Sequence, residues 1–410
     1  MTSGPVSEHP EFQCAVARLL TSRSEEHPFD PAEILGRLRA EQPLARVGHP
    51  DGTAGWLATS QSIVRAVLAD RRFSARPDLM NLPLPGAPPP GQMPPPQPGM
   101  FPDMDPPDHT RYRRLLAGRF TVRRMRGLTI RVEQIVADHL DAMARHGGPL
   151  DLMTAYAQPV PALVICELLG VPYTDREQFQ EHAVLLTSTA ATADARLAAI
   201  TALHAYLSDL VSAKRARPND DLLSELTTTD VTQDELVNIA IVLLGAGLDT
   251  TANMLGLGAF ALLQHPDQLP ALKTAGAVDE LLRYLSIIPF TMRSALAEVE
   301  LDGQLITAGE TVSLSIQAAN RDPDQWPDPD ALDLIRPAAG HLAFGHGIHQ
   351  CLGQQLARVE LQIALPALFD RFPALHLTEP AESVPMRDHA SIYGITRLLV
   401  GWTSPGHRPT

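Results

Sequence analysis

The stretch HLAFGHGIHQCLG at residues 341–353 contains three histidines, three glycines and one cysteine. Apolar residues at helical spacing follow it, so a helix is expected to begin at Leu352. The first turn of a helix offers unpaired amide N–H groups and the positive end of its dipole, and both stabilise a thiolate. The glycines would let the backbone lie against a flat ligand, where a Cβ atom would collide. The stretch therefore predicts a functional site at Cys351.

Four chemistries remain open for this loop when it is considered alone. His346, His349 and Cys351, with His341, are suitable zinc ligands, although the spacing H-x-x-H-x-C is unusual for a structural zinc site. Cys351 could be a nucleophile activated by His349, but side chains two residues apart seldom face each other in regular structure. It could also be an axial thiolate ligand to an iron, or a packed thiol. The rest of the sequence is needed to choose among them.

The composition is that of a soluble globular enzyme, because 44% of the 410 residues are hydrophobic and 20% are charged. The first twenty residues lack the pattern of a secretory signal, and no uninterrupted apolar stretch reaches the length that spans a bilayer. We therefore expect a cytoplasmic protein. Its three distant cysteines argue against a disulfide framework. A formal net charge of -14 disfavours nucleic acid and anionic membranes as partners.

The periodicity predicts a mainly α-helical fold with a minor β region. Helical spacing runs through most of residues 121–278, whereas strand patterns are confined to residues 55–60 and 295–320, where an Asp-Gly turn indicates small hairpins. Residues 77–107 are dense in proline and glycine, which excludes a regular helix or a central strand. A linker between two domains is one interpretation of that segment. We prefer a lid loop within a single domain of residues 1–410, because packed-fold patterns lie on both sides of it.

One predicted helix is long enough to cross the whole molecule. It begins at a capping box formed by Thr232 and Glu235 and continues to Pro266, which at about 1.5 Å per residue gives a length on the order of 45 Å. Its middle, residues 245–251, reads GAGLDTT. Glycines in a helix interior cost roughly 1 kcal/mol each, and a buried Asp or Thr needs partners. The pattern indicates either a polar kink or a place where a flat ligand approaches the backbone.

Several motifs resemble those of the cytochrome P450 family along nearly the whole chain. The haem-binding signature F-G-x-G-x-H-x-C-x-G is matched in full by Phe344, Gly345, Gly347, His349, Cys351 and Gly353. The oxygen-activation motif of the central helix is matched by Ala246, Gly247, Asp249 and Thr250. The joint occurrence of these motifs favours the iron-ligand interpretation of Cys351.

Four shorter matches accompany them. Glu280 and Arg283 match the E-x-x-R pair, which by itself is commonly an exposed ion pair worth a few tenths of a kcal/mol. Arg293 and the A-N-R-D-P stretch at residues 319–323 follow in the expected order. Upstream, DPPDHTRYRRLL matches the helix that binds the haem propionates.

The resemblance implies the cytochrome P450 fold, a triangular helical prism with the haem between the long central helix and the helix after the cysteine loop. It implies a haem-thiolate monooxygenase that uses haem b and O2 to hydroxylate or epoxidise a small hydrophobic molecule, such as a polyketide, macrolide or terpenoid secondary metabolite. It also implies that Cys351 is the metal ligand, that Asp249 and Thr250 are catalytic, and that Glu280 and Arg283 are structural. The expected cofactor contacts are His109, Arg113, Ala246, Gly247, Arg293, Phe344, Gly345, His349, Cys351 and Gly353. The expected substrate pocket comprises Met93, Leu243, Phe290, Thr291, Met292 and Ile392.

A separate source of electrons is expected, because 410 residues leave no room for a fused reductase beside this fold. Residues 111–127 contain seven arginines and no acid, a local reversal of charge that favours an acidic partner. The resemblance implies a ferredoxin and an NAD(P)H-dependent ferredoxin reductase. Two alternatives are kept: a catalytically silent haem-fold recruitment module, and a Cys/His zinc or hydrolase site. The motifs do not choose the substrate or the position of its oxidation.

Overall fold

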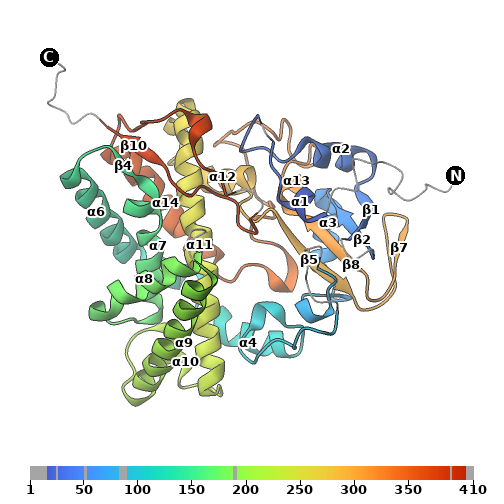
Figure 1. Cartoon of the computed structure of the whole chain (residues 1–410), viewed down its shortest axis with the longest axis horizontal. Coiled ribbons are helices and arrows are strands. Elements are labelled where there is room, and N and C mark those ends of the chain that lie inside the picture. Colours follow the sequence, from blue (N-terminus) through green and yellow to red (C-terminus); the bar gives the residue numbers. More distant parts are fainter. Residues whose placement is uncertain are drawn as a thin grey trace.

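The computed structural model describes residues 16–24, 26–49, 53–82, 90–187, 192–387 and 390–402. In these ranges a large helical body lies beside a smaller region of strands and short helices (Figure 1). The helices are α1 (Val16–Thr21), α2 (Glu33–Glu41), α3 (Gln61–Ala69), α4 (Asp108–Ala117), α5 (Val122–Gly127), α6 (Thr129–His146), α7 (Pro159–Leu169), α8 (Arg176–Thr187), α9 (Ala193–Ala216), α10 (Leu222–Leu226), α11 (Gln233–Gln264), α12 (Ala277–Leu285), α13 (Ile316–Ala319) and α14 (Gln354–Arg371). The strands are β1 (Leu44–Gly48), β2 (Ala54–Ala58), β3 (Phe73–Ser74), β4 (Leu150–Asp151), β5 (Phe290–Ala295), β6 (Val299–Leu301), β7 (Gln304–Ile306), β8 (Thr311–Ser315), β9 (His376–Leu377) and β10 (Leu399–Gly401).

The central helix α11 runs through the middle of the helical body, as predicted (Figure 1). The Thr232 hydroxyl accepts a hydrogen bond from the Glu235 amide, and the Glu235 carboxylate accepts one from the Thr232 amide, so the capping box is formed. The helix ends at Gln264, just before Pro266, which has no amide hydrogen to donate. Its 32 residues give a length of roughly 48 Å.

By length and composition alone, α11 also qualifies as a membrane span, with a mean hydropathy of 1.4 over its most apolar part. However, 67% of that part is buried inside the protein. Helices α7, α9 and α14 pack against it. These contacts are those of a core helix in a helical bundle.

The strands form a five-stranded sheet in the order β1-β2-β8-β5-β3, a three-stranded sheet in the order β4-β10-β9, and the separate hairpin β6–β7. Only β2 and β8 pair in parallel among the strands described, with Trp56 opposite Val312. In the hairpin, Asp302 and Gly303 have φ angles of 51° and 70°, the left-handed backbone that an Asp-Gly turn provides. Strands occur in both predicted ranges, 55–60 and 295–320, but residues 316–319 form α13. The prediction also missed strands outside these ranges, namely β1, β3, β4, β9 and β10.

The largest hydrophobic cluster contains residues from Phe29 to Val400, so both ends of the described chain contribute to it. A second cluster lies between α3 and the five-stranded sheet, and a third joins α1 and α2 to the edge of that sheet. The core thus connects the helical body with the strand region.

Part of the proline-rich segment, residues 83–89, lies outside the described residues. The described remainder of residues 77–107 contains short 3-10 turns at Pro77–Leu79 and Phe101–Asp103 and no longer helix or strand. The Asn238 side chain donates a hydrogen bond of 2.8 Å to the Pro98 carbonyl. At Gly99, with φ +94°, a Cβ atom would lie 2.6 Å from the Glu235 carbonyl oxygen. This end of the segment therefore packs directly on the first turns of α11.

Candidate active site

The Cys351 loop is a tight turn that ends at the first residue of α14. The Cys351 amide donates to the Phe344 carbonyl at 2.8 Å, and the helix begins at Gln354 with Gly353 as its N-cap. The start predicted at Leu352 is therefore two residues too early. Gly345 and Gly347 have φ angles of 65° and 74°, a backbone that favours glycine.

Gly347 has a different role from the one expected, because a Cβ atom there would collide with the Leu68 carbonyl at the end of α3. This glycine lets the loop pack on α3 rather than on a flat ligand. Beside Gly345 and Gly353, in contrast, a Cβ atom would meet nothing within 4 Å. Open space therefore adjoins the loop at Gly345 and Gly353.

Cys351 is an exposed residue, although protein atoms lie close around its sulfur. This burial raises the pKa of Cys351, while the amides of Gly353 and Gln354 and the guanidinium groups of Arg113 and Arg358 act in the opposite direction. A hydrolase would need His349 as the base that activates Cys351, but the His349 ring packs against His109. A metal ion deprotonates a thiol that binds it, so an iron ligand does not need a low intrinsic pKa.

Four basic side chains from three parts of the chain meet next to this loop. The rings of His109, on α4, and His349 lie 4.0 Å apart. Burial, together with the positive charges of Arg113 and Arg293, lowers the pKa of His109 to about 4 and that of His349 to about 3. Burial also lowers the pKa of Arg293 to about 10, which leaves this guanidinium charged at neutral pH.

At neutral pH this cluster therefore consists of two neutral imidazoles and two positive guanidinium groups. Asp105 acts on it from nearby, but its carboxylate is hydrogen-bonded to Ser74. The His109 Nε2 atom is buried and has no hydrogen-bond partner within the described chain. Two positive charges and an unsatisfied ring nitrogen fit the two propionates of a haem, because buried carboxylates need such neighbours.

The centre of α11 supplies the opposite wall. Gly245 and Ala246 are exposed, although most of the helix around them is buried. The Thr250 hydroxyl donates a hydrogen bond of 2.6 Å to the Ala246 carbonyl, the back-bond that loosens a helical turn. Leu243, Ala246 and Thr250 are spaced by three and four residues and so share one face of the helix. At Gly247 the direction of a Cβ atom is filled by Ile165 of α7, so this glycine permits close packing of the two helices.

Asp249 is held by two partners. Its Oδ1 atom accepts hydrogen bonds of 2.8 Å from Arg387 Nη1 and of 2.8 Å from Asn253 Nδ2. The side chains of Asp249 and Arg387 are each 12% exposed, so this ion pair is largely buried. The carboxylate has a fixed position beside Thr250 in the chain.

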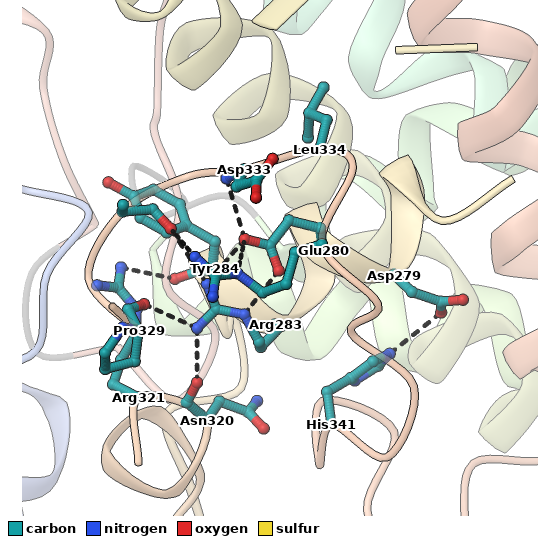
Figure 2. A network of polar contacts seen from close by, with 12 residues as sticks. Asp279, Glu280, Arg283, Tyr284, Asn320, Arg321, Pro329, Asp333, Leu334 and His341 are labelled. Carbon is teal, nitrogen blue, oxygen red and sulfur yellow. Dashed lines mark hydrogen bonds and ion pairs between the residues drawn. The ribbon is translucent and has the colours of Figure 1, made fainter. Parts of the chain in front are cut away.

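The E-x-x-R pair is completely buried, which corrects the interpretation of an exposed ion pair (Figure 2). The Glu280 carboxylate accepts hydrogen bonds from Arg283 Nε at 2.7 Å and from Arg336 Nε at 3.1 Å. Arg283 also donates to the carbonyls of Asn320 and Pro329, each at 2.8 Å. Arg283 therefore links α12 by hydrogen bonds to residues 320–329, which precede the Cys351 loop in the chain.

Comparisons with known proteins agree with this arrangement. The family model of cytochrome P450 matches residues 268–398. Cytochrome P450 105C1 from a Streptomyces species is 46% identical over 389 residues, which cover 93% of this chain and 98% of the relative. The chain belongs to the cytochrome P450 family. Pentalenic acid synthase of Streptomyces avermitilis is 40% identical over 385 residues, which cover 92% of this chain and 95% of the relative.

The fold prediction is confirmed by solved structures of the same family. The crystal structure of cytochrome P450 MoxA from Nonomuraea recticatena matches with a TM-score of 0.87 and 41% sequence identity, covering 93% of this chain and 98% of that structure. This P450 is a monooxygenase, and a haem iron is the cofactor of its family. A catalytically silent recruitment module is therefore not the function of the chain.

The zinc alternative for the P450 loop is also disfavoured by geometry. His341 Nε2 lies 3.1 Å from Asp279 Oδ1, and the His349 ring packs on His109. Within the described ranges, no group of three or more His, Cys, Asp or Glu side chains is arranged to hold a metal ion. His341 and His349 thus have partners away from Cys351.

The structure separates the residues predicted to form the substrate pocket of the P450. In β5, side chains alternate between faces, so Phe290 and Met292 point opposite to Thr291 and Arg293. Phe290 packs on the N-terminal hydrophobic cluster, whereas the Thr291 hydroxyl accepts from Arg293 Nη1 at 3.3 Å. Thr291 is therefore the pocket candidate on β5 that lies on the same face of the strand as Arg293 of the basic cluster.

The remaining pocket candidates lie on two loops and on α11. Met93 and Ile392 are half-buried, and Leu243 is buried on the same face of α11 as Thr250. Next to Ile392, the Tyr393 hydroxyl donates to the Pro28 carbonyl at 2.7 Å. The backbone around Ile392 is thereby fixed to the N-terminal region.

Sequence reasoning missed several residues that hold the site. Asn253 lies four residues after Asp249, so helical spacing alone could have identified it. Arg387 is 138 residues away from Asp249, and Arg336 is 56 residues away from Glu280. No local pattern connects such positions, and only the fold brings them together.

Proposed function

We propose that this P450 hydroxylates or epoxidises a small hydrophobic secondary metabolite, such as a polyketide, macrolide or terpenoid, as a cytoplasmic enzyme whose residues 1–410 form one domain. The observation that carries the proposal is the Cys351 loop, which presents a thiol at the start of α14 near the guanidinium groups of Arg113 and Arg358. A relative named pentalenic acid synthase supports a small-molecule substrate. The hydrophobic cluster that includes residues from both ends of the described chain supports the single domain.

The proposed cofactor is haem b, iron protoporphyrin IX. When bound, a haem iron with a thiolate ligand activates O2 and transfers one oxygen atom to the substrate. We assign the iron ligand to Cys351, and the two propionates to His109, Arg113, Arg293 and His349. Donors that are buried and unpaired, such as His109 Nε2, support this assignment. The surfaces proposed to contact the ring are those of Ala246, Gly247, Phe344, Gly345 and Gly353.

Thr250 and Asp249 are proposed to handle protons on the α11 side of the site. Because the Thr250 hydroxyl hydrogen is directed to the Ala246 carbonyl, its oxygen is free to accept a hydrogen bond from a water molecule at the open face. Asp249 directly precedes Thr250 and is held by Arg387 and Asn253. The pair would thus orient water and deliver protons while apolar neighbours such as Leu243 keep the rest of the pocket dry.

Substituting the ligand and the hydroxyl separately tests this proposal. Cys351→Ala should abolish the thiolate-type Soret band of the reduced, carbon monoxide-treated protein. Thr250→Ala should keep that band but divert NAD(P)H consumption from product to hydrogen peroxide. Thr251→Ala, at the adjacent buried threonine, is the matched control and should keep the wild-type ratio of product to NAD(P)H. Unchanged coupling in Thr250→Ala would remove the role assigned to this hydroxyl.

Electrons are proposed to come from a separate ferredoxin and an NAD(P)H-dependent ferredoxin reductase. Two of the arginines in the basic segment are engaged within the protein, since Arg111 pairs with Glu235 and Arg119 pairs with Glu225. Arg114 is exposed on α4 and is the better candidate for contact with an acidic partner.

Charge reversal at that position tests the docking surface. Arg114→Glu should slow reduction by ferredoxin several-fold at low salt and weaken its salt dependence. Arg145→Glu, at an exposed arginine near the end of α6, is the control for the overall change in net charge. Equal rates for the two variants would contradict docking at α4.

A further inference from the structure

The ion pair of Arg358 and Asp279 lies beside the Cys351 loop, and neither residue has been assigned a role so far. Arg358 Nε, on α14, donates a hydrogen bond of 2.9 Å to Asp279 Oδ1, on α12. The two side chains are 22% and 26% exposed, so neither is fully surrounded by water. Charges in such positions are screened less than charges on an open surface.

Contacts to the loop itself fix the position of Arg358. Its guanidinium carbon lies 4.7 Å from the centroid of the Phe344 ring, and its Nη1 atom donates to Gln354 Oε1 at 3.0 Å. The Phe344 carbonyl accepts a hydrogen bond from the Cys351 amide, and Gln354 begins α14 three residues after Cys351. The guanidinium group of Arg358 thus contacts Phe344 and Gln354, the two residues that lie on either side of Cys351 in the loop.

Asp279 is equally well fixed, by donors on two sides. His341 Nδ1 accepts from the Ala343 amide at 3.2 Å, so the ring proton is on Nε2 and is donated to Asp279 at 3.1 Å (Figure 2). The neighbouring Glu280 turns into the separate network around Arg283 (Figure 2). The carboxylates of Asp279 and Glu280, which are adjacent on α12, therefore belong to different hydrogen-bond networks. The carboxylate of Asp279 lies on the side of the loop.

We propose that Asp279 is a positioning residue that offsets the charge of Arg358 and thereby sets the reduction potential of the iron bound at Cys351. The proposal rests on the proposed ligand role of Cys351. Reduction adds one electron to the iron, so an unbalanced positive charge nearby favours the reduced form and an unbalanced negative charge favours the oxidised form. Arg358 is placed to act in this sense, because its guanidinium group contacts Phe344 and Gln354 on either side of Cys351 in the chain.

The two single substitutions should therefore act in opposite directions. Asp279→Asn leaves Arg358 unbalanced and should raise the potential, whereas Arg358→Met leaves Asp279 unbalanced and should lower it. Each shift should correspond to about a threefold to tenfold change in the equilibrium constant of the one-electron couple, where tenfold equals about 59 mV. The double variant Asp279→Asn/Arg358→Met and the conservative Arg358→Lys should both lie close to the wild type.

Dye-mediated redox titration of the purified holoenzymes measures these shifts directly. The pair Asp141–Arg371, whose arginine lies at the far end of the same α14, supplies the matched controls Asp141→Asn and Arg371→Met. Shifts of the same sign in both Asp279 and Arg358 variants would indicate a merely structural role and overturn the proposal. Shifts below twofold, or equal to those of the controls, would also overturn it.

The same samples distinguish failure of this inference from failure of the proposed function. A wild-type enzyme without a thiolate-type carbon monoxide band would invalidate the ligand role of Cys351 itself. A normal band in every variant, with no opposite shifts in potential, would refute only the role of Asp279.

Discussion

Replacing Glu280 by Gln should lower the free energy of unfolding by about 3–5 kcal/mol, the cost of removing one partner from a buried ion pair. The carboxylate accepts two hydrogen bonds from Arg283, at 2.7 and 2.8 Å, and one each from Arg336 and the Asp333 amide, both at 3.1 Å. Glu280 and Arg283 are 0% exposed, so water cannot replace these contacts. The amide of Gln keeps one acceptor oxygen but leaves two guanidinium groups without a counter-charge.

Urea unfolding, followed both by far-UV circular dichroism and by haem absorption, measures this loss. Two probes are needed because a cofactor protein does not unfold in a single two-state step. Asp141→Asn is the control, since its partner Arg371 lies 3.3 Å away and the two side chains are 60% and 48% exposed. Such a surface pair contributes about 0–1 kcal/mol. A Glu280→Gln variant within about 1 kcal/mol of the wild type would refute the reasoning.

Two further substitutions test smaller features. Burial raises the pKa of Glu235, but hydrogen bonds from Arg111 and other donors outweigh it and bring the pKa from 4.5 to about 2. Glu235→Gln should therefore cost on the order of 3 kcal/mol above about pH 5, a difference that shrinks as the pH falls from about 4.5 to about 2. Urea midpoints across this range check the trend, and a difference independent of pH would contradict it. Gly347→Ala should reduce haem retention, measured by pyridine haemochrome, because a Cβ atom would strike the Leu68 carbonyl; Gly36→Ala, where a Cβ atom meets nothing within 4 Å, should not.

The parts of the fold that depend on neighbouring residues can be predicted from the sequence. The capping box at Thr232 and Glu235 determines where α11 begins, and the Asp-Gly pair determines the β6–β7 turn. The start of α14 is harder to predict, because the amide of Gly353 is directed to the sulfur of Cys351 and the first helical residue is Gln354. Whether a backbone amide joins a helix or faces a side chain depends on three-dimensional geometry. The spacing of apolar residues in the sequence does not encode that geometry.

For the candidate site, the sequence indicates which residues carry chemistry but not what holds them. Thr250 and Asp249 stand out because polar residues are costly in an apolar helix. Their environment depends on Arg387, which reaches Asp249 from the C-terminal part of the chain. Burial of Glu280 depends in the same way on Arg336, so an E-x-x-R motif read alone suggests an exposed pair.

The guanidinium groups of Arg113 and Arg293, which act on His109 and His349, also affect how the protein is produced. A dianionic ligand that binds only the folded chain raises its apparent stability by mass action, in proportion to the logarithm of the free ligand concentration. Cultures in which haem synthesis lags behind translation should therefore yield material with a lower melting temperature and a greater tendency to aggregate. Supplying a haem precursor at induction should therefore improve the folding of this enzyme as well as its activity.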